Sequence, residues 1–198
     1  MLTMRAALAA LIGIGLCACA PGTARTNDEP GPSGSVVQPT MPAVVPGYLE
    51  VDPETGLHMT GTPTVVDIKT FRLNINGKVD NELSLTYDEL LLLPEMTATA
   101  VLECEGYFTD TATWSGVSLK ELLDMAGVQS DAGKIIIRSA DGYKTTLSLE
   151  EAAAPGNFLA YELEDETLPV LHGFPLRAVF PGLTGYYWAK WVQEIVVE

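Results

Sequence analysis

Residues 118–139, SLKELLDMAGVQSDAGKIIIRS, hold the change of pattern that decides the fold class. Ser118 and Glu121 have the spacing of a capping box, and Gly127 supplies a stop signal for the helix that begins there. The apolar positions recur at helical spacing: Leu119, Leu122, Leu123 and Ala126. Residues 134–139, KIIIRS, then form a β-branched run that predicts a strand. A short helix and a strand therefore follow each other within this stretch.

Short elements of both kinds continue on either side of this stretch. Before it, residues 71–75 and 97–104 have the pattern of strands, and a capping box at Thr86 precedes a short helix at 90–93. After it, Ser148 begins a third short helix. The remaining expected strands are 158–163, 176–180 and 191–197. Strands outnumber helices without alternating strictly with them, which favours an α+β fold with a mixed, curved sheet or partial barrel over a doubly wound α/β fold.

Composition limits the functions that the chain can have. The chain has 198 residues, of which 47% are apolar, and this suits one domain with a real core plus extensions. Its 11 Lys and Arg against 26 Asp and Glu give a formal net charge of −15. Because that charge repels phosphate backbones, nucleic-acid binding is not expected. The sequence also lacks a G-x-G-x-x-G or P-loop motif, so nucleotide binding has no support.

The first residues have the pattern of an export signal. Residues 6–16 are an apolar run of eleven, which is too short to span a bilayer and typical of a signal-peptide core. Residues 16–19, LCAC, have the form of a lipobox, so we expect 1–19 to be a lipoprotein signal with Cys19 as the lipidated residue. Ordinary cleavage before Pro21 is the alternative. The expected location is therefore outside the cytoplasm, on a membrane to which the lipid anchors the chain.

The segment after this signal has the composition of a linker. Residues 20–60 are rich in Pro, Gly, Ser and Thr and poor in large apolar residues. Because Pro and Gly disfavour helices and central strands, this composition predicts a disordered tether, followed by a globular domain at 61–198. His58 falls within the predicted tether and receives no role there.

Cys104 is the one cysteine expected in the folded domain, because Cys17 and Cys19 belong to the export signal. It ends a predicted strand near Gly106, where a thiol can face a cleft and the backbone can approach a ligand closely. Thiolates suit soft or high-valent metals. A buried core cysteine on one face of that strand is the alternative.

A second group of candidate residues lies near the C-terminus. Residues 172–177, HGFPLR, place the imidazole of His172 and the guanidinium of Arg177 on either side of a rigid turn. Lys190 follows between two tryptophans. Because guanidinium and ammonium groups bind phosphate oxygens, these three side chains could together hold a phosphate. A buried histidine and a surface ion pair are the alternative.

Taken in order, several segments resemble the molybdopterin-dependent oxidoreductase domain of the sulfite oxidase family, in a short, lipoprotein-like bacterial form. The segments are 71–73 (FRL), 102–106 (LECEG), 113–117 (TWSGV), 141–143 (DGY), 159–163 (LAYEL), 172–177 (HGFPLR), 181–182 (PG) and 185–191 (GYYWAKW). Each segment alone is weak, but the ordered set covers nearly the whole predicted domain. The fold implied is that of the sulfite-oxidase-like molybdopterin-binding domain.

The resemblance also implies a cofactor and a reaction. In that family, the cysteine at the position of Cys104 ligates molybdenum, and residues at the positions of His172, Arg177 and Lys190 contact the phosphate of molybdopterin. The implied reaction is oxygen-atom transfer on a small oxo substrate or a sulfoxide, with a separate membrane or haem protein as redox partner. Two other functions stay open: a cofactor-free binding module on the same fold, and a structural lipoprotein with a reactive thiol.

Overall fold

The computed structural model describes residues 36–198, and residues 37–198 form one compact unit. The predicted export signal and its Cys19 lie outside the described residues. Within the described part of the chain, no helix combines the length and the apolar character that a bilayer crossing requires.

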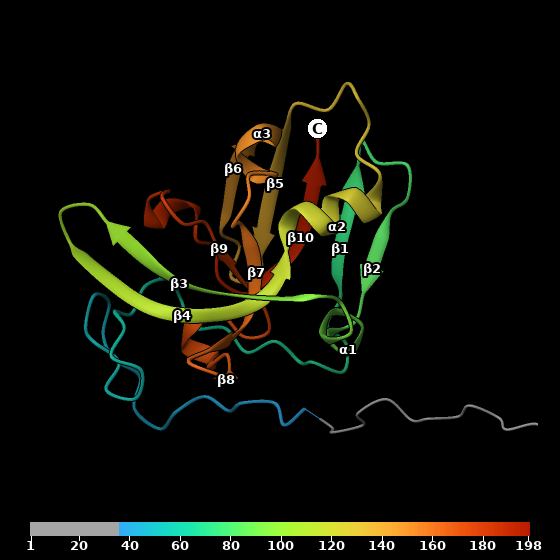
Figure 1. Cartoon of the computed structure of the whole chain (residues 1–198). Helices are drawn as coiled ribbons and strands as arrows, with labels where there is room; N and C mark the ends of the chain where they lie inside the picture. The colour runs from blue at the N-terminus through green and yellow to red at the C-terminus, as the bar shows by residue number, and fades with distance from the viewer. Residues whose placement is uncertain (1–35) are drawn as a thin grey trace, which may run out of the picture. The chain divides into compact units, whose positions relative to one another are not determined.

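The first of two sheets contains five strands in the order β2-β1-β10-β5-β6 (Figure 1). Their bounds are Leu73–Gly77 for β1, Leu83–Leu85 for β2, Lys134–Ser139 for β5, Lys144–Ser148 for β6 and Val192–Val197 for β10. β1 runs parallel to β10 and the other neighbours are antiparallel, so the sheet is mixed. The C-terminal strand β10 lies at the centre, where Ile195 is fully buried.

The second sheet also contains five strands, in the order β3-β4-β7-β8 with β9 paired to β7. Their bounds are Glu95–Cys104 for β3, Phe108–Ser118 for β4, Phe158–Leu163 for β7, Glu166–Thr167 for β8 and Arg177–Val179 for β9. All pairs are antiparallel, and β3 and β4 form a long hairpin that runs across the view of Figure 1. β7 approaches β4 closely at Gly116, where any Cβ would overlap the carbonyl oxygen of Leu159.

Three short α-helices complete the domain: α1 (Tyr87–Leu91), α2 (Leu119–Ala126) and α3 (Leu149–Ala152). The capping box predicted at Thr86 is complete, and a complete capping box also forms at Ser148, where the start of a helix was predicted. At Ser118 one of the two hydrogen bonds of the predicted capping box forms: the Ser118 hydroxyl accepts from the backbone N–H of Glu121 at 3.4 Å. The buried face of α2 contacts β1 of one sheet and β4 and β7 of the other, so the core lies between the sheets around this helix.

The expected α+β fold with a mixed sheet and short helices is confirmed. The strands are divided between two sheets, and within residues 36–198 neither sheet closes into a barrel. The structure adds four strands that the sequence pattern did not predict: β2, β4, β6 and β8. β4 is the longest of them, and it lies between β3 and β7 at the centre of the second sheet.

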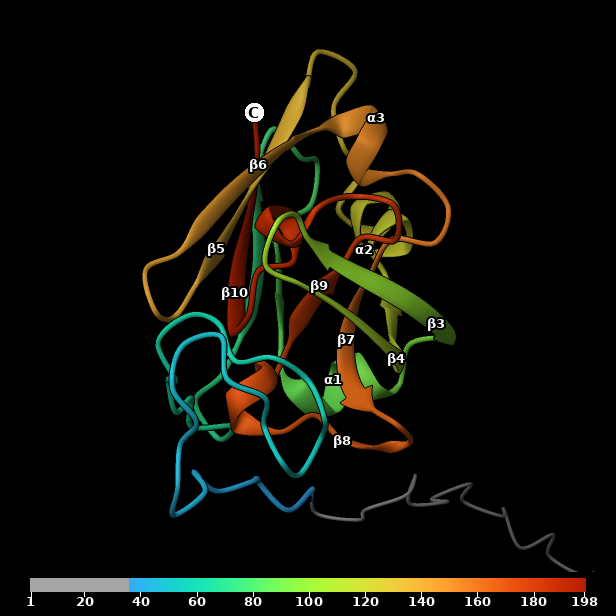
Figure 2. The ribbon, with the colours of Figure 1, turned by 90° about the vertical axis from the view of Figure 1, so that its left-hand side faces the viewer.

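Residues 47–61, which we call the strap, pack on the domain as an ordered loop, drawn in cyan in Figure 2. A β-bridge joins Val51 to His58, and the side chains of Leu57 and Met59 are buried. The prediction of a disordered tether reaching to residue 60 is therefore wrong for the strap. The reason is that its turn-forming residues close a loop whose apolar side chains anchor it to the core.

Candidate functional site

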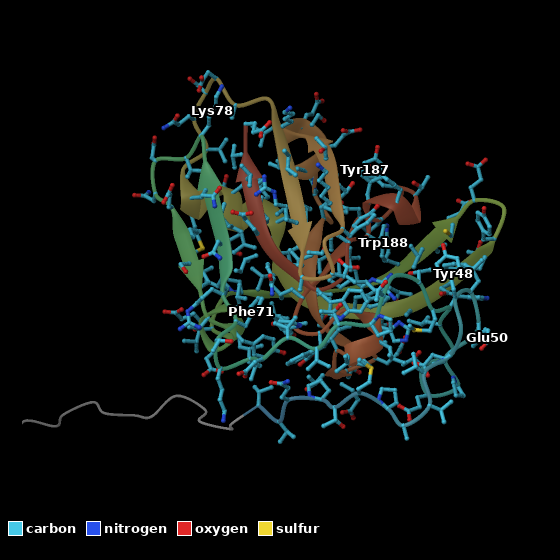
Figure 3. All side chains as sticks on the ribbon, turned by 180° about the vertical axis from the view of Figure 1, so that it is seen from behind. Tyr48, Glu50, Phe71, Lys78, Tyr187 and Trp188 are labelled. Carbon is cyan, nitrogen blue, oxygen red and sulfur yellow. The ribbon has the colours of Figure 1, made fainter. Side chains whose placement is uncertain are left out.

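A cavity of about 430 Å³ lies where the turn end of the β3–β4 hairpin, the β5–β6 turn and the segment before β10 meet the strap. Three of the four predicted site residues line it: Cys104, Arg177 and Lys190. Tyr48 of the strap and Trp188 also line it, and Figure 3 shows both on the side of the molecule where the hairpin turn lies. His172, the fourth predicted residue, is fully buried and does not line the cavity.

Cys104 is the last residue of β3 and pairs across the hairpin with Phe108, which also lines the cavity. Its thiol is free and partly exposed. A Cβ on Gly185 would lie 3.6 Å from the Cys104 Sγ, so this glycine packs directly against the thiol. The alternative of a buried core cysteine does not fit a thiol in the wall of a cavity.

Arg177 begins β9 and is 3% exposed. Its guanidinium lies 4.8 Å from the ring centre of Trp114 and 5.8 Å from that of Trp188. Nη1 donates to the carbonyl oxygen of His172 at 3.3 Å, whereas Nε has no partner among the described residues. Burial lowers the pKa of Arg177 to about 10. The side chain is thus a buried cation with an unused hydrogen-bond donor.

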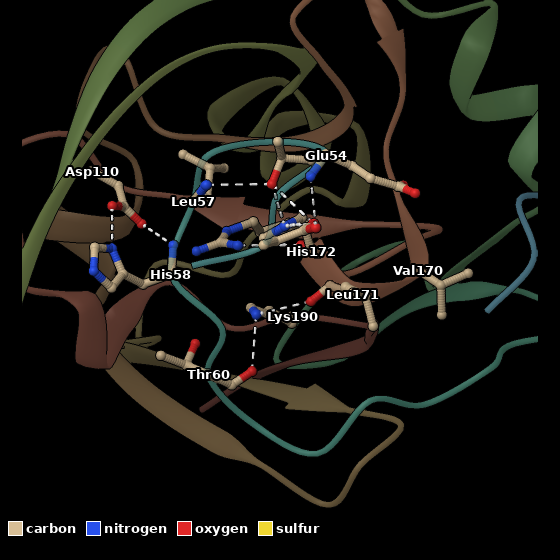
Figure 4. Close-up of polar contacts among 12 residues, drawn as sticks. Glu54, Leu57, His58, Thr60, Asp110, Val170, Leu171, His172 and Lys190 are labelled. Atoms are coloured by element: carbon tan, nitrogen blue, oxygen red, sulfur yellow. Dashed lines mark hydrogen bonds and ion pairs between the residues drawn. The ribbon is translucent and has the colours of Figure 1, made fainter. Parts of the chain in front are cut away.

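Lys190 is 6% exposed and lies between the strap and the 3₁₀ helix η1 (Val170–His172). Its Nζ donates to the carbonyl oxygen of Thr60 at 2.9 Å and to that of Leu171 at 3.0 Å (Figure 4). Burial and, after it, the positive charge of Arg177 lower the pKa of Lys190 well below its ordinary value.

Arg177 and Lys190 share an electrostatic feature: neither has a carboxylate within 4.0 Å in the described part of the chain. The alternative of a surface ion pair is therefore wrong, because both cations are buried and both lack a paired acid. Buried charges are normally paired, and this chain carries a net charge of −15, so acids were available. An anion in the cavity would supply the missing negative charge, and phosphate oxygens suit these donors.

His172 lies behind the cavity wall at the end of η1. Its Nε2 lies 2.9 Å from Asp52 Oδ2 and 2.8 Å from Thr55 Oγ1, both in the strap. Burial, with smaller effects from Lys190 and Arg177, lowers the pKa of His172 to about 3. The imidazole is therefore neutral at pH 7. Its Nδ1 has no partner among residues 36–198.

The sequence pattern missed two histidine–aspartate contacts that the strap makes. Asp52 contacts His172, and His58 contacts Asp110 through both its backbone N–H (2.8 Å) and its ring Nδ1 (2.7 Å) (Figure 4). The His58 ring also stacks on Phe108, with 4.4 Å between ring centres. Residues 52–56, DPETG, fall within the predicted tether, and nothing in this local sequence indicates which distant side chains its turn meets.

The outer part of the cavity wall is aromatic. Tyr48, Tyr143 and Tyr186 line it, and each has a large exposed fraction. Tyr143 donates its hydroxyl to the carbonyl oxygen of Tyr186, and the two rings meet edge to face at 6.0 Å. Asp141 adds a carboxylate to the same wall. We call these four residues the rim.

Comparison with known proteins gives a consistent family. Residues 59–198 match the model of the oxidoreductase molybdopterin binding domain. The uncharacterized oxidoreductase YuiH of Bacillus subtilis is 33% identical over 142 residues, covering 70% of this chain and 71% of YuiH. The putative protein-methionine-sulfoxide reductase subunit YedZ1 of Azospira oryzae is 31% identical, covering 67% of this chain and 50% of that protein.

Larger enzymes match over part of their length. Mitochondrial sulfite oxidase of Drosophila melanogaster is 32% identical, covering 67% of this chain and 28% of the enzyme. The crystal structure of the sulfane dehydrogenase SoxCD from Paracoccus pantotrophus superposes with a TM-score of 0.69 at 26% identity, covering 77% of this chain and 44% of that one. This chain therefore spans half or less of these larger relatives.

Proposed function

This chain belongs to the molybdopterin-binding oxidoreductases of the sulfite oxidase family, and from that premise we propose that it reduces a sulfoxide at the cavity that holds Cys104. Family membership confirms the predicted resemblance, the enzyme class and, with them, the molybdenum–molybdopterin cofactor. The substrate, the redox partner and the role of each site residue are proposals.

The residues of the cavity fit this cofactor. The unpaired Nε–H of Arg177 and the ammonium of Lys190 would hold its phosphate, and the Cys104 thiolate would ligate the metal. When bound, the cofactor supplies a metal that exchanges an oxygen atom and two electrons with the substrate. A phosphate contact by His172 stays a prediction, because its ring lies behind the cavity wall. One observation carries the proposal: two buried cations without a carboxylate partner line the same cavity as the thiol.

The rim favours a neutral sulfoxide over an anionic substrate. Tyr48, Tyr143 and Tyr186 offer apolar ring surface to an organic substituent. Asp141 and the net charge of −15 repel an anion such as sulfite, which would also compete with the cofactor for the two cations. The balanced reaction takes a sulfoxide, two protons and two electrons to a thioether and water. The electrons would come from a separate membrane or haem protein.

Cofactor content and turnover test this function together. The full chain would be expressed in a molybdenum-fed host, and molybdenum and pterin per chain would be measured beside a Cys104→Ala variant. We expect near-stoichiometric cofactor and oxidation of a reduced viologen by an aryl methyl sulfoxide, with turnover lost in the variant. Oxidation of sulfite with an acceptor dye, at a higher kcat/KM than sulfoxide reduction, would contradict the substrate. Folded protein without molybdenum or pterin would leave a cofactor-free binding module.

We further propose that the protein works outside the cytoplasm, anchored by lipid on Cys19. The support is the apolar run at 6–16 followed by the lipobox pattern LCAC. A Cys19→Ser variant should leave the membrane fraction, and mass spectrometry of the native N-terminal peptide should show a diacylglycerol on Cys19. Native protein found in the soluble cytoplasmic fraction would refute this proposal.

A further inference from the structure

The strap makes polar contacts with His172, at the end of η1, and with Lys190, which lines the cavity. The Asp52 carboxylate and the Thr55 hydroxyl reach the ring of His172, and the carbonyl oxygen of Thr60 accepts from Lys190. Asp52 is 4% exposed although it carries a charge. Asp52 and Thr55 precede residues 59–198, the part of the chain that matches the family.

The hydrogen bonds around His172 fix which nitrogen carries its proton. Thr55 Oγ1 donates to Asp52 Oδ2 at 3.0 Å, so the Thr55 oxygen is left to accept from His172 Nε2. Burial alone would raise the pKa of Asp52, but hydrogen bonds from the Glu54 N–H and from His172 lower it overall, so Asp52 is an ionised acceptor. Both neighbours of Nε2 therefore accept, and the neutral ring must hold its proton there.

The turn that carries His172 also holds the two cavity cations. The carbonyl oxygen of Leu171 accepts from Lys190 Nζ at 3.0 Å, and that of His172 accepts from Arg177 Nη1 at 3.3 Å. Gly173 packs between these two residues, since a Cβ there would lie 3.1 Å from Lys190 Cβ and 3.3 Å from Arg177 Cβ. The backbone of this turn therefore supports both cations, and a shift of the turn would move them.

We propose that Asp52 and Thr55 are positioning residues for the cofactor site: they hold His172 in the Nε2–H form and so fix the two cations that receive the phosphate. The proposal rests on the proposed function for the identity of the ligand. Within residues 36–198, the charged groups that act on His172 are Asp52 from the strap, Arg177 from β9 and Lys190 from the segment before β10.

The first test measures the tautomer of His172 without using the cofactor. The sequence contains two histidines, so a long-range ¹H–¹⁵N spectrum of the ¹⁵N-labelled full chain shows two imidazoles, and a His58→Gln variant assigns them. We expect His172 to show one protonated nitrogen, Nε2, from pH 5 to 8. In Asp52→Asn the amide can donate to Nε2, so the Nδ1–H form should appear. A wild-type ring protonated on Nδ1, or an identical spectrum in Asp52→Asn, would overturn the proposal.

The second test measures how long the holoenzyme keeps its cofactor. By analogy with the outer hydrogen-bond partners of metal ligands, which contribute 10–100-fold to affinity, we expect Asp52→Asn and Thr55→Val to release pterin on the order of tenfold faster than wild type. Thr55→Ser keeps the hydroxyl and should restore the wild-type rate. Glu54→Gln removes one negative charge next to Asp52 without touching His172, so it serves as the matched control. Equal release rates in all four variants would refute the positioning role.

The two tests separate this inference from the proposed function. If the wild-type protein carries no molybdenum or pterin, the proposed function fails, and the tautomer spectrum still decides whether Asp52 fixes His172. If the cofactor is present and the spectrum of Asp52→Asn equals that of wild type, the positioning role alone fails. Circular dichroism of each variant shows whether it folds, and the Thr55 pair provides a second route if Asp52→Asn does not.

Discussion

The two ends of the cavity are built from opposite chemistry. At the inner end, Arg177 and Lys190 are 3% and 6% exposed, and both are cations held by backbone carbonyl groups. At the rim, Tyr48 and Tyr186 are 73% and 58% exposed and offer ring surface. The inner end therefore carries the unfavourable energy of desolvated charge, whereas the rim is a solvated surface. Changes at the inner end should affect cofactor binding and stability, and changes at the rim should affect substrate binding alone.

The largest effect is expected from Lys190→Met, which keeps the length of the side chain and removes its charge. Removing one partner of a buried charge contact costs about 2–5 kcal/mol, so cofactor affinity should fall at least ~30-fold. Molybdenum and pterin per chain, measured after gel filtration, would check this result. Lys78→Met is the matched control, because Lys78 is exposed and pairs with Asp131 (Figure 3 labels Lys78). Equal cofactor content in the two variants would contradict a phosphate role for Lys190.

The same variant should change how the stability of the cofactor-free protein depends on pH. The pKa of Lys190 is depressed by folding, so between that pKa and its ordinary value the unfolded chain binds one more proton. Stability should therefore rise as the pH rises toward the ordinary pKa of lysine, by up to about 1.4 kcal/mol per pH unit from this group. Tyr87, Tyr143 and Tyr161 have raised pKa values and act above pH 10 in the opposite sense. Urea unfolding at several pH values should show this rise in wild type and a flatter profile in Lys190→Met.

The sequence predicted correctly those elements that are defined by neighbouring residues, such as helix caps and apolar runs. The helix at 119–126 and the strands at 134–139 and 158–163 have the predicted bounds, because caps and runs of apolar residues define them. β4 was missed because its sequence, FTDTATWSGVS, is polar at its start and its burial depends on pairing with both β3 and β7. Such pairing is set by distant segments, which β-propensity alone does not encode.

The residues of the candidate site also fall into two groups, those that local sequence indicated and those that it missed. The motif HGFPLR and the cysteine at a strand end indicated Arg177 and Cys104, and both line the cavity. Asp52 was missed because the segment around it has the composition of a linker. Its role depends on a contact with His172 across 120 residues of sequence. The prediction of a linker rested on the content of Pro and Gly, whereas this loop is ordered because a few of its side chains, such as Leu57 and Met59, are buried.

The smallest effect is expected at the rim, from Tyr186→Ala. Loss of one aromatic contact costs about 0.5–1.5 kcal/mol, so KM for an aryl sulfoxide should rise roughly two- to tenfold. The kcat should stay unchanged, because ring surface binds ground state and transition state alike. The hydrogen bond from Tyr143 goes to the backbone carbonyl of residue 186 and survives the change. Tyr107→Ala is the control, since Tyr107 is 73% exposed at the hairpin turn and does not line the cavity. A fall in cofactor content in Tyr186→Ala would show that the two ends of the cavity are coupled, and the division between them would fail.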